Sequence, residues 1–161
     1  CCSQLKKINI SFTYTIIGAA GDEELQYLVN DLGLKKNVIL AGRKSQYQVF
    51  DLMREASVLL MPSVEEGLPN VIVEAMLVGL PVISTNCGGV PELITDSKEG
   101  WLVPTRNPEA IANAIEAFVD MPLKEIEAVR TAAREKAAKQ HNEEQMVRGM
   151  EGLYFEVLGV N

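Results

Sequence analysis

The sequence predicts a doubly wound α/β fold, in which helices cover both faces of a mostly parallel sheet. The predicted strands are short, almost continuous apolar runs, such as residues 38–42 and 58–62, which is typical of strands covered on both faces. Strands alternate with amphipathic helical segments along the chain. With 161 residues, the chain is long enough for one domain with its own core, so we expect residues 1–161 to form a single domain.

The expected elements follow one another as strand and helix pairs. The predicted strands cover residues 13–18, 38–42, 58–62, 82–85 and 100–103. The predicted helices cover residues 2–7, 22–32, 45–56, 69–78, a short stretch at 91–94, 108–119, and a charged helical tail from about residue 123 to residue 158.

Local signals predict where several of these helices begin and end. Ser45 precedes an amphipathic segment and is the expected N-cap of that helix. Pro69 suits the first helical position, because its missing N–H is not needed there. Gly33 and Gly79 follow the last apolar residues of two helices and are expected to end them.

Composition and charge exclude several classes of protein. The chain is 47% hydrophobic and 23% charged, which is ordinary for a globular protein, and its formal net charge is −7. That charge argues against a nucleic acid or an anionic membrane as the main partner. The longest apolar runs are far below the roughly 18 residues that a spanning helix needs, and the start lacks a signal-peptide pattern. A cytoplasmic protein is therefore expected.

The cysteines and the histidine argue against two kinds of site. Cys1, Cys2 and Cys87 are odd in number and lack metal-like spacing, so they are expected to be reduced thiols. The single histidine, His141, lies in a charged helical stretch. A Ser–His–Asp site or a histidine metal site is not expected, and no metal or other cofactor is predicted.

Two segments follow predicted strands at the edge where open parallel sheets bind ligands. The first begins at Gly18 and ends at Gly21, and its glycines would let a phosphate approach the backbone near a helix N-terminus. Because it is not a G-x-G-x-x-G motif, a simple tight turn explains it equally well. The second contains Arg43 and Lys44, which could contact a nucleotide base or phosphates, or could form a solvated loop.

A third segment, from Glu66 to Glu74, carries the richest chemistry. Glu74 is surrounded by apolar helix residues, and burying a charge without a partner is costly. Asn70 lies four residues before it, on the same helix face. The free N–H groups of the first helical turn point back toward Glu66 and favour an anion there. These groups suit a polyhydroxyl ligand with phosphates, although a surface loop and a helix acid reaching solvent remain an alternative.

Residues 86–92 form a glycine-rich turn after the fourth strand. Gly88 and Gly89 would allow the close approach of a ligand or a partner domain, but a purely structural turn is equally compatible with them. Trp101 lies in the fifth predicted strand and is expected to pack in the core or at an edge.

Taken in order, the motifs resemble those of one family, the family-4 "glycosyl transferases group 1" enzymes, and specifically the C-terminal half of their GT-B fold. The motifs that carry the resemblance are residues 62–70, 74–76, 79–84, 88–92 and 100–104. The resemblance covers nearly the whole chain and implies a Rossmann-like three-layer sandwich with a mostly parallel sheet.

The resemblance also implies roles for individual residues. Such enzymes bind a nucleotide-sugar in this domain through an E-x7-E motif, which is Glu66 and Glu74 here. The resemblance implies that Glu66 faces the donor sugar as the catalytic residue and that Glu74 holds the ribose hydroxyls. Backbone amides near Gly67, Leu68 and Asn70 would meet the sugar or diphosphate. Gly18 would lie near the phosphates, and Arg43 with Lys44 near the base. The implied reaction is metal-independent transfer of the sugar with retention at the anomeric carbon.

The chain departs from the family pattern in two ways. Ala20 stands where the family often has a second glycine, which puts the phosphate contact at Gly18 in doubt. An Arg and a Lys that neutralise the diphosphate lie on and after an opening strand that this chain is expected to lack, together with the N-terminal acceptor domain. Because that strand is central in the family's sheet, we expect a gap in the sheet here.

The expected function is therefore the donor-binding half of a retaining, hexosyltransferase-type glycosyltransferase. Its donor would be a nucleoside-diphosphate sugar and its acceptor a glycan or a lipid-linked molecule, in polysaccharide biosynthesis. The full-length protein could associate with the inner face of the cell membrane, and the fragment alone is expected to be inactive. Alternatives are a GT-B nucleotide-sugar 2-epimerase, which the E-x7-E run argues against, and a non-catalytic nucleotide-sugar binding module.

Overall fold

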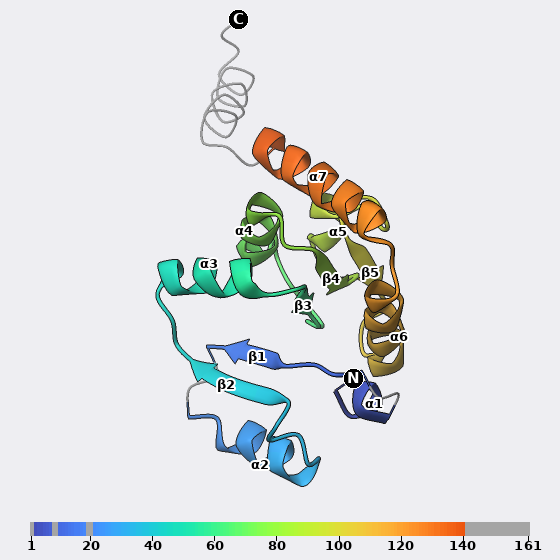
Figure 1. Cartoon of the computed structure of the whole chain (residues 1–161). Coiled ribbons are helices and arrows are strands. Elements are labelled where there is room, and N and C mark those ends of the chain that lie inside the picture. The colour runs from blue at the N-terminus through green and yellow to red at the C-terminus, as the bar shows by residue number, and fades with distance from the viewer. Residues whose placement is uncertain (1, 8–9, 19–20, 141–161) are drawn as a thin grey trace, which may run out of the picture.

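The computed structural model describes residues 2–7, 10–18 and 21–140 (Figure 1). Its helices are α1 (Cys2–Lys7), α2 (Glu23–Asp31), α3 (Gln46–Glu55), α4 (Asn70–Val78), α5 (Val90–Leu93), α6 (Pro108–Val119) and α7 (Leu123–Gln140). Its strands are β1 (Tyr14–Ile17), β2 (Val38–Gly42), β3 (Leu59–Met61), β4 (Val82–Thr85) and β5 (Trp101–Val103). The predicted helical tail beyond residue 140, with His141, lies outside the described residues, as does Cys1.

The described strands form two separate parallel sheets. One has two strands, β1 paired with β2, and the other has three, in the order β3-β4-β5. Among the described residues no strand joins β1 to β3. The alternating α/β architecture with parallel strands is confirmed.

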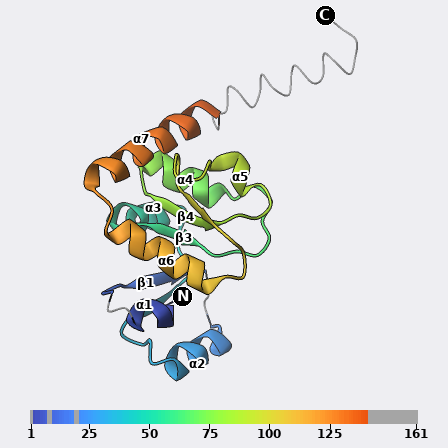
Figure 2. The same cartoon turned by 90° about the vertical axis from the view of Figure 1, so that its right-hand side faces the viewer.

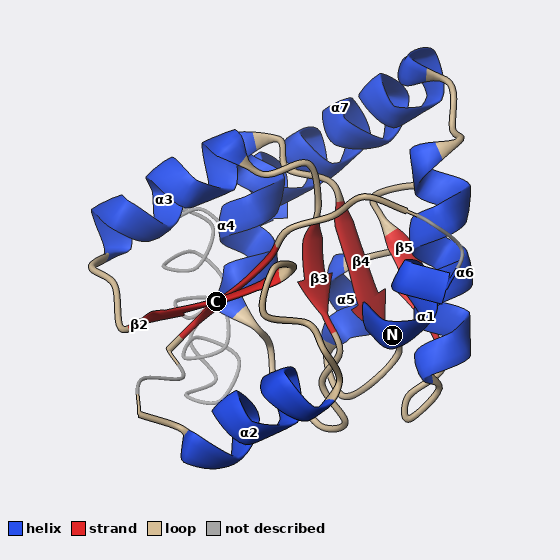
Figure 3. Cartoon of the chain, turned by 60° about the horizontal axis from the view of Figure 1, so that its bottom comes forward, coloured by secondary structure: helices blue, strands red, loops and turns tan. Residues whose placement is uncertain are grey.

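The three-stranded sheet is the middle of a three-layer sandwich (Figure 3). Its central strand, β4, is buried at all four residues. Along β4, Val82 packs in a cluster with α4, α5 and α7, while its neighbour Ile83 packs in a second cluster with α6. This alternation is the period of two that a strand imposes on its side chains. Burial on both faces of the sheet therefore explains the continuous apolar run in this strand.

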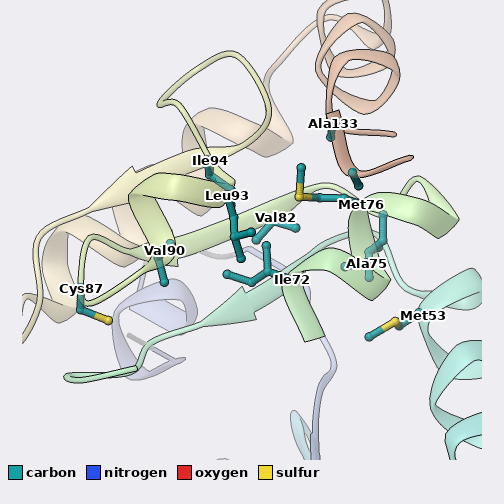
Figure 4. Close-up of a cluster of buried hydrophobic side chains, with 12 residues drawn as sticks. Met53, Ile72, Ala75, Met76, Val82, Cys87, Val90, Leu93, Ile94 and Ala133 are labelled. Atoms are coloured by element: carbon teal, nitrogen blue, oxygen red, sulfur yellow. The ribbon is translucent and has the colours of Figure 1, made fainter. Parts of the chain in front are cut away.

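The larger cluster lies on the side of α4 and α7. Figure 4 shows Ile72, Ala75 and Met76 of α4 gathered with Val82 of β4 and Ala133 of α7. On the opposite face, Trp101 of β5 packs edge-to-face on Phe118 of α6 with ring centroids 5.5 Å apart, which confirms its expected packing role. Figure 2 shows α6 and α1 beside each other, with α7 running above them.

The two-stranded sheet is covered on only one face by the described residues. Val38 and Leu40 pack with Val29 of α2. Ile39 points the other way and is 51% exposed, and Ile17 at the end of β1 is 39% exposed. The prediction that every strand is covered on both faces is therefore wrong for Ile39 and Ile17, whose side chains are largely exposed.

The predicted helix ends largely agree with the structure. Ser45 caps α3 in a reciprocal capping box with Gln48, and Gly33 and Gly79 adopt left-handed φ values of +64° and +77°. Pro69 is the N-cap of α4 and not its first helical residue, so the helix begins one residue later than predicted. Cys2 and Cys87 are both free thiols. None of the described helices has the length and apolar character needed to cross a membrane.

Candidate functional site

The N-terminus of α4 leaves its first-turn N–H groups without a capping side chain. Pro69, its N-cap, makes no side-chain hydrogen bond to the helix. By contrast, Asp22, Ser45 and Asn107 each accept a backbone N–H at the starts of α2, α3 and α6. The N–H of Ile72 donates to the carbonyl of Pro69 at 3.0 Å, and the helix dipole favours an anion at this end of α4.

Glu66 lies in the loop between β3 and α4 and is half-buried. Its Oε1 accepts a hydrogen bond of 2.7 Å from the hydroxyl of Ser63. The next residue, Gly67, is exposed, and its carbonyl accepts a 2.8 Å bond from the N–H of Gly89 in the turn after β4. The loop that carries Glu66 is thus fixed at its side chain and at its backbone.

Glu74 lies on the opposite side of α4 from the core-facing residues Ile72 and Met76 and is half-buried. Its Oε1 accepts a 3.3 Å hydrogen bond from Nε2 of Gln46, the first residue of α3. The polar partner required by an acid in an apolar helix therefore comes from a neighbouring helix. Sequence reasoning missed Gln46, since its 28-residue separation from Glu74 leaves no local signal.

Leu68 and Asn70 flank Pro69 at the start of α4. Asn70 is the first residue of the helix and is exposed, one turn before Glu74 on the same face. The side chain of Leu68 is 46% exposed, beside the Glu66 loop. The structure therefore brings Glu66, Gly67, Leu68, Asn70 and Glu74 together around one helix end.

Arg43 and Lys44 are exposed and connect β2 to α3. The contact between Gln46 and Glu74 brings this connection toward α4. Lys44 itself lines a shallow hollow of about 240 Å³ with residues of α3, among them Asp51 and Glu55. The lining of this hollow contains no residue of the Glu66 loop or of α4.

Gly18 is exposed and has a left-handed φ of +97°. Its N–H donates to the carbonyl of Gly42 at 2.9 Å, which places it at the carboxyl end of the two-stranded sheet. Gly18 therefore belongs to the sheet edge next to Arg43. Ala19 and Ala20, which complete the predicted phosphate turn, lie outside the described residues.

The site's chemistry is that of hydrogen bonding. Two carboxylates accept from hydroxyl groups, and backbone N–H groups of α4 donate to oxyanions. Over residues 2–7, 10–18 and 21–140, no group of three or more His, Cys, Asp or Glu residues is arranged to hold a metal ion.

Comparison with known proteins places these features in a family. The family model "Glycosyl transferases group 1" matches residues 1–140. WcaL of Salmonella typhimurium, provisionally described as a colanic acid biosynthesis glycosyltransferase, is 35% identical over 159 residues. That alignment covers 94% of this chain and 39% of WcaL, so the chain spans about two fifths of this relative's length.

Solved structures share the fold. The C-terminal domain of a glycosyl transferase group 1 family protein, LpcC of Francisella tularensis, superposes with a TM-score of 0.75 at 21% identity, covering 88% of this chain and 76% of that domain. Anabaena HepE, solved in complex with UDP, superposes with a TM-score of 0.77 at 24% identity, covering 88% of this chain and 41% of HepE. The chain therefore belongs to the Glycosyl transferases group 1 family, and its fold is that of the C-terminal half of a GT-B enzyme.

Proposed function

We propose that this chain is the donor-binding half of a retaining glycosyltransferase that uses a nucleoside-diphosphate sugar. The observation that carries the proposal is the arrangement of Glu66 and Glu74 around the uncapped start of α4. Family membership and the UDP complex of the structurally similar HepE support it. Because the chain spans 39% of WcaL, the acceptor site would lie in the rest of a longer protein.

Each part of the site would hold one part of the donor. Glu74 accepts from the ribose hydroxyls, and Glu66 accepts from hydroxyls of the sugar. The first-turn N–H groups of α4 hold the diphosphate, with Gly18 at the far edge of the phosphates. Arg43 and Lys44 lie toward the base.

In the transfer, the bond between the anomeric carbon and the phosphate oxygen breaks, and the acceptor hydroxyl oxygen bonds to that carbon. The electron pair of the broken bond stays on the nucleoside diphosphate, and the acceptor's proton is released. N–H groups at the start of α4 stabilise the departing phosphate, and the Glu66 carboxylate stabilises positive charge at the reacting carbon. Transfer to a glycan or lipid-linked acceptor during polysaccharide assembly fits the name of WcaL.

The ribose role of Glu74 is tested by titrating the chain with UDP and with GDP while recording NMR spectra. Amide shifts should concentrate in residues 63–74. Glu74→Ala should weaken binding by about tenfold or more, because a charged acceptor for two hydroxyls is lost. Glu125→Ala, which removes an exposed acid on α7, is the matched control and should leave the affinity unchanged. Equal affinities for the Glu74 variant and the unaltered chain would refute the ribose role.

The proposal that donor binding and acceptor binding lie in different halves of the protein is tested by measuring sugar transfer. The 161-residue chain should bind nucleotide without transferring sugar, whereas a longer protein that contains it should turn over one donor from a panel of nucleotide-sugars. Sugar transfer by the isolated chain would contradict this division.

A further inference from the structure

Two buried hydroxyls lie side by side at the end of β4, and only one of them reaches the Glu66 loop. Ser84 and Thr85 are 0% and 1% exposed. Ser84 donates to the backbone carbonyl of Met61 or of Thr85, at 3.3 and 3.2 Å. The Thr85 hydroxyl lies 2.5 Å from the carbonyl of Ser63. Ser63 lies in the loop that carries Glu66. Thr85 therefore connects the buried sheet to the loop, and Ser84 does not.

Ser63 carries this connection onward to the acid. Its carbonyl accepts from Thr85, and its hydroxyl donates to Oε1 of Glu66 at 2.7 Å. The thiol of Cys87 also lies 3.7 Å from the same carbonyl. Two hydrogen bonds, one to the backbone and one from the side chain of Ser63, thus connect a fully buried side chain of the sheet to one oxygen of the half-buried carboxylate.

The backbone of the loop rests against a second feature, the Gly88–Gly89 turn. The N–H of Gly89 donates to the carbonyl of Gly67 at 2.8 Å. A Cβ atom on Gly88 would lie 1.7 Å from the carbonyl oxygen of Glu66, and one on Gly89 would lie 2.5 Å from that of Gly67. The backbone of the turn is in direct contact with the backbone of the Glu66 loop. A side chain at Gly88 or Gly89 would therefore displace that loop.

We propose that Thr85, Ser63 and the Gly88–Gly89 turn form a support that positions Glu66 toward the donor sugar. The inference rests on the proposed function of Glu66. A loop carboxylate has several rotamers, and fixing one of its oxygens through Ser63 leaves the other oriented for a sugar hydroxyl. Binding sites gain affinity when such orientation exists before the ligand arrives. These are positioning residues, since they act through Glu66.

The support is tested first without a ligand, through hydrogen exchange of the Gly89 amide measured by NMR. Thr85→Val keeps the side-chain shape but removes the donor, so the loop should loosen and Gly89 should exchange about tenfold faster. Thr85→Ser retains the hydroxyl and should restore slow exchange. Ser84→Ala removes the neighbouring buried hydroxyl and should leave Gly89 unchanged. Equal exchange in the Thr85→Val and Ser84→Ala variants would overturn the support.

The second test asks whether the support serves the sugar, by comparing the affinity for UDP-glucose with that for UDP. Ser63→Ala should weaken UDP-glucose binding by about fivefold to tenfold while leaving UDP binding unchanged, and Ser63→Thr should retain both affinities. This variant changes a half-buried loop residue, so it remains informative if Thr85→Val fails to fold. An equal loss for both ligands, or no loss, would refute the link to the sugar.

The two tests separate this inference from the proposed function. If the unaltered chain binds neither UDP ligand, the same comparison is made with GDP-mannose and GDP. Failure of the chain to bind any of the four would overturn the proposed function and the sugar role together. The exchange of the Gly89 amide would still decide whether Thr85 holds the loop.

Discussion

Gly88 and Gly33 share a left-handed backbone but differ in what surrounds their α-carbons. Their φ values are +50° and +64°. A Cβ on Gly33 would meet only the end of the Lys6 side chain at 3.6 Å, whereas one on Gly88 would meet the Glu66 carbonyl at 1.7 Å. An alanine at Gly33 would therefore meet only backbone strain, whereas an alanine at Gly88 would meet strain and a steric clash with the Glu66 carbonyl.

We predict that Gly33→Ala lowers the free energy of unfolding by about 1 to 2 kcal/mol, the cost of a left-handed alanine. Gly88→Ala should cost more than this and should also shift the amide resonances of Glu66 and Gly67. Urea denaturation and NMR spectra of the two variants provide the measurements. Equal losses, with an unchanged Glu66 loop, would show that the turn does not constrain that loop.

Glu99 is a buried acid, 4% exposed, that lies outside the candidate site. Its Oε2 accepts the N–H of Thr95 at 2.8 Å, and the ammonium groups of Lys98 and Lys136 lie 3.5 and 3.7 Å from its carboxylate. Burial alone raises the pKa of Glu99, but the Thr95 hydrogen bonds and the two lysines outweigh it. The pKa of this carboxyl therefore lies below its ordinary value.

A lowered pKa in the folded state means that the ionised carboxylate stabilises the fold. This contribution is complete above the unfolded pKa, about 4.5, and is lost as pH falls through the folded pKa. We predict that Glu99→Gln is about 1 to 3 kcal/mol less stable than the unaltered chain near neutral pH, and that the difference shrinks below about pH 4.5. Urea denaturation at several pH values measures it, and a constant difference across the acid range would disprove the prediction.

At the residue scale, the sequence predicted the acids of the site but not the groups that hold them. Glu66 and Glu74 are recognisable because their spacing and their apolar surroundings are local features. Their partners are different, since Gln46 is 28 residues from Glu74 and Thr85 is 22 residues from Ser63. Such contacts depend on how helices and strands pack, which no short pattern encodes.

At the scale of elements, α7 packs against α4 and donates hydrogen bonds to its C-terminal end. Arg130 donates through Nε to the carbonyl of Gly79 at 2.6 Å, and Arg134 donates to that of Val78 at 3.2 Å. Between them, Ala133 is buried in the cluster that contains Met76. Cations at a helix C-terminus satisfy its unpaired carbonyls and complement its dipole, so α7 stabilises the helix that carries Glu74.

We predict that Arg130→Ala lowers the free energy of unfolding by about 1 to 2 kcal/mol, because a charged hydrogen bond to a helix end is lost. The matched control is Arg54→Ala, which removes an exposed ion pair with Asp51 on α3 and should change stability by less than about 0.5 kcal/mol. Thermal and urea denaturation of both variants test this. Similar small losses in the two variants would mean that the Arg130 contact contributes no more than an ordinary surface pair.

Element boundaries were the part of the fold that the sequence predicted most closely. The strand at Val38–Gly42 and the helix at Pro108–Val119 agree with their predicted ends, because caps, prolines and glycines act within a few residues. Coverage of the strands was harder to predict. Residues 38–42 form a continuous apolar run, but Ile39 is half exposed, since coverage depends on which elements lie above the sheet.

At the scale of the whole molecule, the two sheets each have an edge strand without a neighbour among the described residues. β1 pairs only with β2, and β3 pairs only with β4. An unpaired edge presents a row of free N–H and C=O groups. We propose that a longer protein containing this chain supplies a strand that pairs with both edges and joins the two sheets. Figure 1 shows β1 and β3 in neighbouring parts of the fold.

This proposal predicts hydrogen exchange at single amides. The N–H groups of Tyr14 and Gly18 donate toward β2, and that of Leu59 donates toward β4. Because successive amides of a strand point to opposite sides, those of Thr15, Ile17 and Leu60 face the unpaired edges.

In the 161-residue chain the three edge-facing amides should exchange quickly, while Tyr14, Gly18 and Leu59 exchange slowly and act as controls within the same strands. In the longer protein, the edge-facing amides should become protected by at least about tenfold, because each gains a hydrogen-bond acceptor. Identical exchange of Thr15, Ile17 and Leu60 in the two proteins would show that no strand joins the sheets. Protection confined to β1 or to β3 would mean that a strand adds to one sheet without linking both.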